Sequence, residues 1–188
     1  MTRIIQKIDM MQIRFSSQKN EVYEKLAYAI FLFTFGSVAG WCLEVVFRSV
    51  CHGGLYIPGF LMGPYCPIYG MGVVMFVFVC NHKNKWRSYI EIVVLSSVLE
   101  YVISFLAETM FGQILWDYSD IPFSIGTRVS LIFSLAWGVL GVLLLLAEPV
   151  VKRLYERHLQ TYRDLSLGII SAICLDFILS AAMAVKHL

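Results

Sequence analysis

The chain has 188 residues, of which 59% are hydrophobic and only 15% are charged, and its mean hydropathy is +0.72. A soluble domain carries about 25% charged residues, so this composition predicts a polytopic membrane protein. A net charge of +2 gives no reason to expect nucleic acid as a partner, and the length leaves no room for a soluble catalytic or ATPase domain.

Residues 1–25 are predicted to form a cytoplasmic amphipathic segment ahead of a single transmembrane helical domain, residues 26–188. Four apolar side chains fall on one helical face of this segment: Ile4, Ile8, Met11 and Phe15. Such a face, with basic residues beside it, is typical of a helix at the cytoplasmic lipid surface. A frayed tail is the alternative. The segment contains no apolar core of a secretory signal.

The first membrane segment is expected at about Leu26–Val50. Gly36 and Gly40 form a GxxxG pair, which lets a second helix approach closely. The same row continues through Glu44 to Arg48, so these two charges are expected to pair along one face of the helix.

The second segment is predicted to be broken. Residues 53–72 contain six glycines and three prolines, and each proline removes a backbone donor and clashes with the preceding turn. A helix over Pro67–Cys80 would rise roughly 21 Å, which is short of the ~30 Å hydrocarbon core. We therefore expect either a short helix or a partly re-entrant segment that the other helices surround.

Three further helices are expected at about 88–111, 129–147 and 165–185. Each carries a row of small or polar residues four positions apart: Ser96, Glu100, Ser104 and Glu108; Ser130, Ser134 and Gly138; Ala172, Asp176 and Ser180. These rows are predicted to pack inward, and Asp176, without an obvious basic partner, to hydrogen-bond another helix. The expected fold class is all-α, with about five transmembrane helices and no convincing internal repeat.

The basic residues predict the orientation of the chain. Five of the 15 lie before residue 26, three between residues 83 and 87, and four between residues 152 and 163. By the positive-inside rule, the N-terminus is cytoplasmic and the chain crosses five times, which fits a multi-pass protein of the bacterial cytoplasmic (inner) membrane. If the second segment only dips and returns, the count becomes four; the basic cluster at 83–87 argues against that.

This topology gathers charged side chains toward the outer side of the membrane, where each costs about 2.5–3.5 kcal/mol unless it is paired or lines a cavity. We predict an outward-facing polar pocket between the segments at about 26–50, 88–111 and 129–147, capped by the glycine-rich stretch. Its predicted lining is Trp41, Glu44, Arg48, Gly63, Pro64, Cys66, Pro67, Tyr69, Glu100, Ser104, Glu108, Trp116, Asp117, Tyr118, Arg128 and Trp137.

Structural explanations exist for the same residues. Glu44–Arg48 and Glu100–Arg128 are alternatively internal ion pairs that hold the helices in register. Glu108, Asp117 and Asp120 are alternatively solvated loop acids, and Trp116, Tyr118 and Trp137 are alternatively aromatic residues of the membrane interface. Cysteine and histidine spacings predict neither a metal site nor a cofactor, and no nucleophile–base pair stands out, so an enzyme is disfavoured.

Several motifs together resemble the family of putative ABC-transporter type IV (CmpB-like) membrane proteins. They are Gly40-Trp41 with Glu44, GFLMGPYCPIYGMG at 59–72, Glu100, Phe111-Gly112 followed by WDYSD, and Trp137-Gly138. The resemblance spans roughly Gly36 to Leu140. It implies a multi-helix integral membrane protein with a transport label, and it supplies no substrate.

Three functions follow as hypotheses. The first is a transport-related membrane subunit that binds a small solute in the outward pocket and relies on an ATPase or other transporter subunit. The second is a membrane-embedded enzyme or lipid-binding protein that acts on a headgroup or isoprenoid, with carboxylates as acid and base. The third is a structural scaffold. Membrane lipids and a second copy of the chain are the other expected partners.

Overall fold

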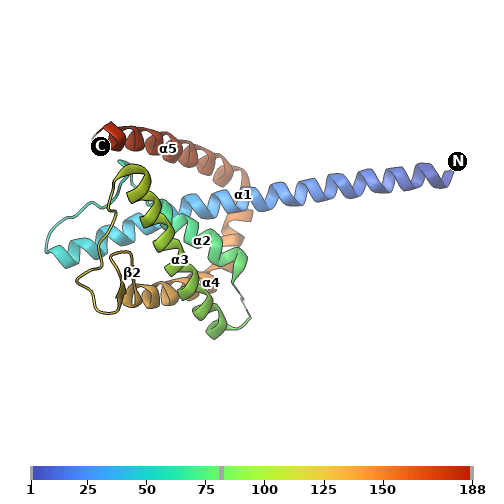
Figure 1. Ribbon diagram of the computed structural model, residues 1–188. Helices are drawn as coiled ribbons and strands as arrows, with labels where there is room; N and C mark the ends of the chain where they lie inside the picture. The colour runs from blue at the N-terminus through green and yellow to red at the C-terminus, as the bar shows by residue number, and fades with distance from the viewer. Residues whose placement is uncertain (1, 81–82, 187–188) are drawn as a thin grey trace.

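The computed structural model describes the backbone of residues 2–80 and 83–186, and the side chains of residues 20–80 and 83–185. The described chain is all-α apart from one small hairpin (Figure 1). Its elements are α1 (Thr2–His52), α2 (Pro67–Val79), α3 (Lys85–Phe111), β1 (Ser124–Ile125), β2 (Val129–Ser130), α4 (Leu131–Arg157) and α5 (Leu159–Lys186).

Four of the helices are long and apolar enough to cross a membrane. These stretches are Asn20–His52, Lys85–Phe111, Leu131–Arg157 and Leu159–Val185. The short apolar helix α2 corresponds to the predicted second segment. It begins at Pro67 as expected, because proline at the first helical position loses no intrahelical hydrogen bond. With 13 residues it rises roughly 20 Å, so the membrane path of the preceding loop stays a prediction.

Helix boundaries differ from the prediction at the predicted cytoplasmic side. The basic stretch 148–164 was expected to be a loop, and this is wrong: α4 continues through Pro149 to Arg157, and α5 starts only two residues later. A proline removes one intrahelical hydrogen bond without ending a helix whose neighbours hold it. α1 is likewise unbroken from Thr2, and the domain division at residue 25 stays a prediction. The apolar face formed by Ile4, Ile8, Met11 and Phe15 lies outside the described side chains.

The predicted GxxxG contact is confirmed, and its partner is α2. A Cβ atom on Gly40 would lie 2.2 Å from the Tyr69 ring, and one on Gly36 would lie 2.8 Å from Val73. Gly70 of α2 reciprocates, since its Cβ would meet the Phe33 carbonyl oxygen at 2.3 Å. Small residues on both helices therefore let the two backbones approach closely, as in membrane helix pairs generally.

The polar rows of α3 and α4 face inward as predicted, except for Glu108, which is exposed near the end of α3. Ser96, Ser104, Ser130 and Ser134 are all buried, and the two helices are joined by a hydrogen bond of 2.8 Å between Ser97 Oγ and Ser134 Oγ. On α5 the row is partly different: Asp176 and Ser180 are buried, whereas Ala172 is exposed and Ile173 takes the inward position.

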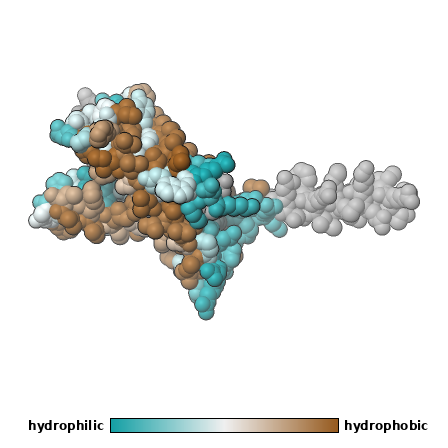
Figure 2. Space-filling model, turned by 90° about the horizontal axis from the view of Figure 1, so that it is seen from below, coloured by the Kyte–Doolittle hydropathy of each residue, from teal (hydrophilic) through white to brown (hydrophobic). Residues whose placement is uncertain are grey.

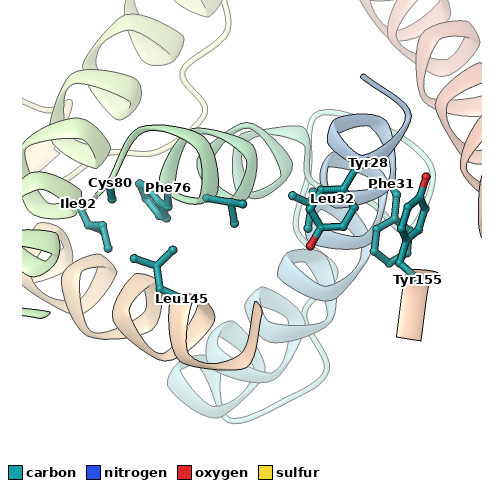
Figure 3. Packing of buried hydrophobic residues seen from close by; sticks show 9 residues of the cluster. Tyr28, Phe31, Leu32, Phe76, Cys80, Ile92, Leu145 and Tyr155 are labelled. Carbon is teal, nitrogen blue, oxygen red and sulfur yellow. The ribbon is translucent and has the colours of Figure 1, made fainter. Parts of the chain in front are cut away.

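The apolar core has two parts (Figure 3). Phe76, Ile92 and Leu145 pack where α2, α3 and α4 meet, and Tyr28, Phe31 and Tyr155 join α1 to the end of α4. Around this core the outer surface is largely apolar, with hydrophilic residues gathered where the N-terminal part of α1 leaves the bundle (Figure 2). An apolar outer surface is what a lipid environment requires.

Candidate functional site

Glu100, in the middle of α3, is a buried carboxylate, with only 4% of its surface exposed. Its Oε1 atom accepts hydrogen bonds from Trp137 Nε1 at 2.9 Å and from the Tyr118 hydroxyl at 3.5 Å. Its Oε2 atom is buried and has no hydrogen-bond partner among the residues that the structure describes. A buried unpaired acceptor costs roughly 1–3 kcal/mol, and more when it is charged.

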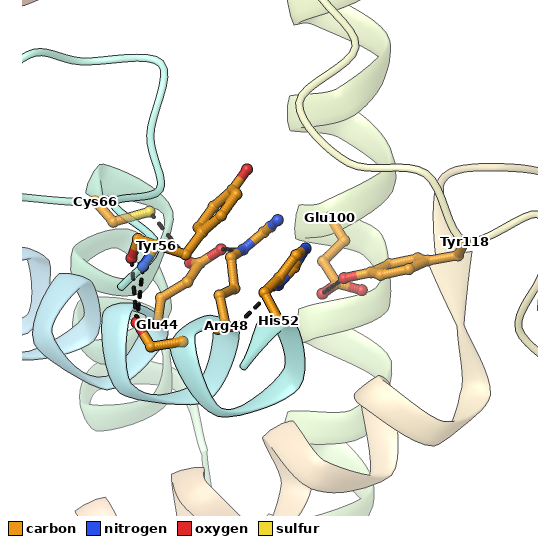
Figure 4. A network of polar contacts seen from close by, with 8 residues as sticks. Glu44, Arg48, His52, Tyr56, Cys66, Glu100 and Tyr118 are labelled. Atoms are coloured by element: carbon orange, nitrogen blue, oxygen red, sulfur yellow. Dashed lines mark hydrogen bonds and ion pairs between the residues drawn. The ribbon is translucent and has the colours of Figure 1, made fainter. Parts of the chain in front are cut away.

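A second carboxylate approaches from α1. Glu44 Oε1 pairs with Arg48 Nε at 2.8 Å, so the predicted i,i+4 ion pair is present. These side chains are 17% and 28% exposed, respectively, and Glu44 is near enough to Glu100 for the two carboxylates to repel each other. In Figure 4, the Tyr118 hydroxyl points toward the Glu100 carboxylate.

Aromatic side chains complete this group. The Tyr69 ring, in the first turn of α2, lies 4.8 Å from the Trp137 ring of α4. The Tyr118 ring stacks on Phe133 at 4.9 Å. We call the set Glu44, Arg48, Tyr69, Glu100, Tyr118 and Trp137 the Glu100 cluster.

The loop that carries Tyr118 is held by its own backbone. Tyr118 N donates to the Thr127 carbonyl oxygen at 3.0 Å, and Ser124 Oγ donates to the Tyr118 carbonyl oxygen at 2.6 Å. Burial, followed by the charges of Glu100 and Glu44, raises the pKa of Tyr118 well above its ordinary value. The hydroxyl therefore stays protonated at neutral pH and serves as a donor to Glu100.

The N-terminus of α2 also reaches this cluster. Cys66 precedes Pro67 at the helix start, and its thiol lies 3.9 Å from Glu44 Oε2. Cys66 N donates to the Ser37 carbonyl oxygen at 2.9 Å, which fixes the entry of α2 against α1. A carboxylate near a helix N-terminus is favourably placed with respect to the helix dipole.

Four other predicted pocket residues form a separate group. Arg128 does not pair with Glu100, so that predicted ion pair is wrong. Its Nη2 lies 2.6 Å from Glu108 Oε2, its Nη1 donates to Ser104 Oγ at 3.3 Å, and Trp116 Nε1 donates to its carbonyl oxygen at 2.9 Å. The tight hairpin between β1 and β2 directs Arg128 toward the end of α3 rather than its middle.

Asp176 of α5 was predicted to hydrogen-bond another helix, and this is wrong: apart from Ser180 on its own helix, its partners lie in the loop before α2. Its carboxylate accepts hydrogen bonds from the backbone N–H groups of Met62 and Gly63, at 3.2 and 2.8 Å, and from the Tyr65 hydroxyl at 2.8 Å. Ser180 Oγ donates to it at 3.0 Å. The sequence shows an isolated acid in an apolar helix and a broken segment whose backbone amides need acceptors. The spacing of the residues did not indicate that these two features contact each other. Gly63 therefore belongs to this contact.

The remaining predicted pocket residues lie at the margin. Pro64 and Asp117 are exposed, and Trp41 is half-buried on α1, one turn before Glu44. Asp117 Oδ1 accepts a hydrogen bond from Ser119 N at 2.8 Å, which lowers the pKa of this carboxyl group. Asp117 thus has the environment of a solvated loop acid. In residues 20–80 and 83–185, no three His, Cys, Asp or Glu side chains are placed to hold a metal ion.

A hollow of about 340 Å³ lies elsewhere, between α1, α2 and α5. It is apolar and is lined by Ala29, Ile30, Phe33, Met71, Val74, Met75 and Ile170. None of the predicted pocket residues is part of this lining.

Comparison with known protein families gives one match. The family described as "Putative ABC-transporter type IV" matches residues 31–181. This range extends the resemblance seen in the sequence from about residue 140 to α5, and it contains both Glu100 and Asp176. No curated protein and no solved structure matches the chain.

Proposed function

Because the chain belongs to the Putative ABC-transporter type IV family, we propose that it is a transport-related membrane subunit that binds a small solute at the Glu100 cluster. The observation that carries this proposal is the buried Oε2 atom of Glu100, left without a donor within the described chain. A bound solute with a donor group would satisfy it.

The free-energy cost of burying charged side chains in the Glu100 cluster supports a binding role. Charges inside a membrane protein are expensive, and they are retained where they pair or serve a function. Glu44 and Arg48 pair with each other, but Glu100 receives only neutral donors from Trp137 and Tyr118. Ion pairing therefore accounts for the α1 charges and leaves the α3 charge unexplained.

Access to the cluster is proposed from the outer side of the membrane. Two loops, residues 53–66 and 112–123, contribute Cys66 and Tyr118 to it or next to it. Both loops lie at the end of the bundle where α1 and α3 finish, and the predicted orientation places that end outside. A pocket there would face outward, with residues 53–66 covering it.

The proposal includes a partner. A transport cycle needs an energy source, and the family description points to an ATPase or another transporter subunit as the partner that provides it. Membrane lipids would contact the apolar outer surface.

A lipid-binding protein or membrane-embedded enzyme is the second candidate. The apolar hollow between α1, α2 and α5 favours it, because an acyl chain would fill such a space in a bilayer. A pure scaffold is the third candidate, and the Glu44–Arg48 pair favours it.

Native mass spectrometry of the gently extracted protein tests the proposal. We expect a small solute and a partner subunit to co-purify with the wild-type protein, and the solute to be absent from the Glu100→Gln variant. Glu91→Gln is the matched control, because it makes the same change on the same helix, where Glu91 pairs with Arg87. A solute retained equally in both variants, or a bound lipid alone, would refute the proposal.

A further inference from the structure

The charges around Glu100 do not balance. Among the described side chains, Trp137 of α4 and Tyr118 of the loop donate to Glu100, and Glu44 of α1 repels it. Arg48 and Tyr69 lie next to these residues, because Arg48 pairs with Glu44 and the Tyr69 ring packs on Trp137. With Glu44 and Glu100 both ionised, two carboxylates and one guanidinium beside two neutral tyrosines leave one negative charge. Arg128, the nearby arginine of the hairpin, is committed to Glu108.

This surplus determines which solutes fit. An anion would meet two carboxylates in a region of low dielectric, where repulsion is stronger than in water. A neutral solute would leave the buried charge of Glu100 uncompensated, which is the most costly state of a buried ion. A monocation would restore neutrality, and its N–H groups would donate to Oε2.

The aromatic residues favour the same class of solute. Trp137 turns its N–H edge to the carboxylate, and the Tyr69 ring packs on the Trp137 ring with the centroids 4.8 Å apart. The outer faces of such rings attract ammonium and guanidinium groups. Ca²⁺ and Mg²⁺ prefer six or more oxygen ligands, and the described acids around Glu100 are too few to supply them.

We propose that the solute bound at the Glu100 cluster is a small organic monocation with N–H donors, an alkylammonium in the simplest case, held by Glu100 Oε2 beside Trp137. This inference rests on the proposed function, because it names the class of solute for the same site.

Equilibrium binding of radiolabelled methylammonium to the purified full-length protein in detergent at pH 7 tests the inference. We expect saturable binding to the wild-type protein and to Glu91→Gln. Binding should be at least about tenfold weaker in Glu100→Gln, since a charge-assisted hydrogen bond and the charge itself are lost. Glu100→Asp keeps the charge one methylene further back and should retain a weakened preference for methylammonium over acetate. If Glu100→Gln does not fold, the Glu100→Asp variant tests the inference, and an unchanged preference for methylammonium over acetate in it would count against a role of Glu100.

The outcomes separate the two proposals. If the co-purified solute is neutral or anionic and needs Glu100, the solute site stands and the cation inference falls. If the carboxyl group only takes up a proton, seen as pH-dependent proton release without methylammonium binding, the cation inference also falls. If neither methylammonium nor a co-purified solute depends on Glu100, both proposals fall.

Discussion

Replacement of Asp176 by asparagine is expected to release residues 62–65 from α5. The carboxylate now accepts four hydrogen bonds, from Met62 N, Gly63 N, the Tyr65 hydroxyl and Ser180 Oγ. An asparagine side chain keeps one acceptor oxygen and turns an NH₂ group toward the other donors. At least two of the four hydrogen bonds should therefore be lost.

The expected loss of stability follows from these contacts. Hydrogen bonds between membrane helices average about 0.6 kcal/mol, and hydrogen bonds to charged groups contribute about 1.5–3 kcal/mol. Two lost bonds at about 0.6–1.5 kcal/mol each correspond to a decrease of about 1–3 kcal/mol in the free energy of unfolding. The matched control is Asp164→Asn on the same helix, because Asp164 is exposed and contacts Gln160 one turn away. Its effect should stay within about 0.5 kcal/mol.

Two measurements check this prediction. The first is reversible unfolding in detergent mixtures, followed by circular dichroism. The second is the rate of maleimide reaction at Cys66, in a background without the other four cysteines, because Cys66 directly follows the released residues. We expect faster labelling in Asp176→Asn. A stability loss no larger than that of Asp164→Asn, together with unchanged labelling, would refute the assigned role of Asp176.

Two further predictions concern packing and the Glu100 cluster. Gly40→Ala should lower the free energy of unfolding by about 1–3 kcal/mol, because the new Cβ would lie 2.2 Å from the Tyr69 ring. The control is Gly168→Ala, because a Cβ there meets nothing within 4 Å. Equal melting temperatures of the two variants would contradict the close α1–α2 contact. Trp137→Phe should cost about 1–3 kcal/mol by removing the 2.9 Å donor to Glu100. In a double-mutant cycle with Glu100→Leu, which removes the acceptor, strictly additive losses would show that the hydrogen bond does not contribute.

The sequence predicted those parts of the fold that depend on contacts within a helix. Helical periodicity identified the inward rows of α3 and α4. It also placed Glu44 and Arg48 next to each other on one face of α1, because residues four apart on a helix are neighbours. Pro67 marked the start of α2 for an equally local reason.

Contacts made through irregular backbone were not predictable in this way. Arg128 follows Gly126, which has a φ of +61°, in the turn between β1 and β2, and this turn decides that Arg128 reaches Glu108 and not Glu100. The partners of Asp176 are backbone amides of residues 62 and 63, whose direction no residue type specifies. Periodicity therefore predicts which face of a helix carries the polar side chains, whereas loop geometry decides which of these side chains contact each other.

Residues 62–69 connect the Asp176 contact with the Glu100 cluster. Asp176 holds residues 62–65, and the next residues, Cys66 to Tyr69, lie against Glu44 and Trp137. Asp176 itself forms its hydrogen bonds with residues outside the Glu100 cluster, so any effect of its replacement on solute binding must pass through this segment. We therefore expect Asp176→Asn to weaken solute retention at Glu100 together with the faster labelling of Cys66. Faster labelling with full retention would show that residues 62–65 move independently of the cluster, and α5 would then have a purely structural role.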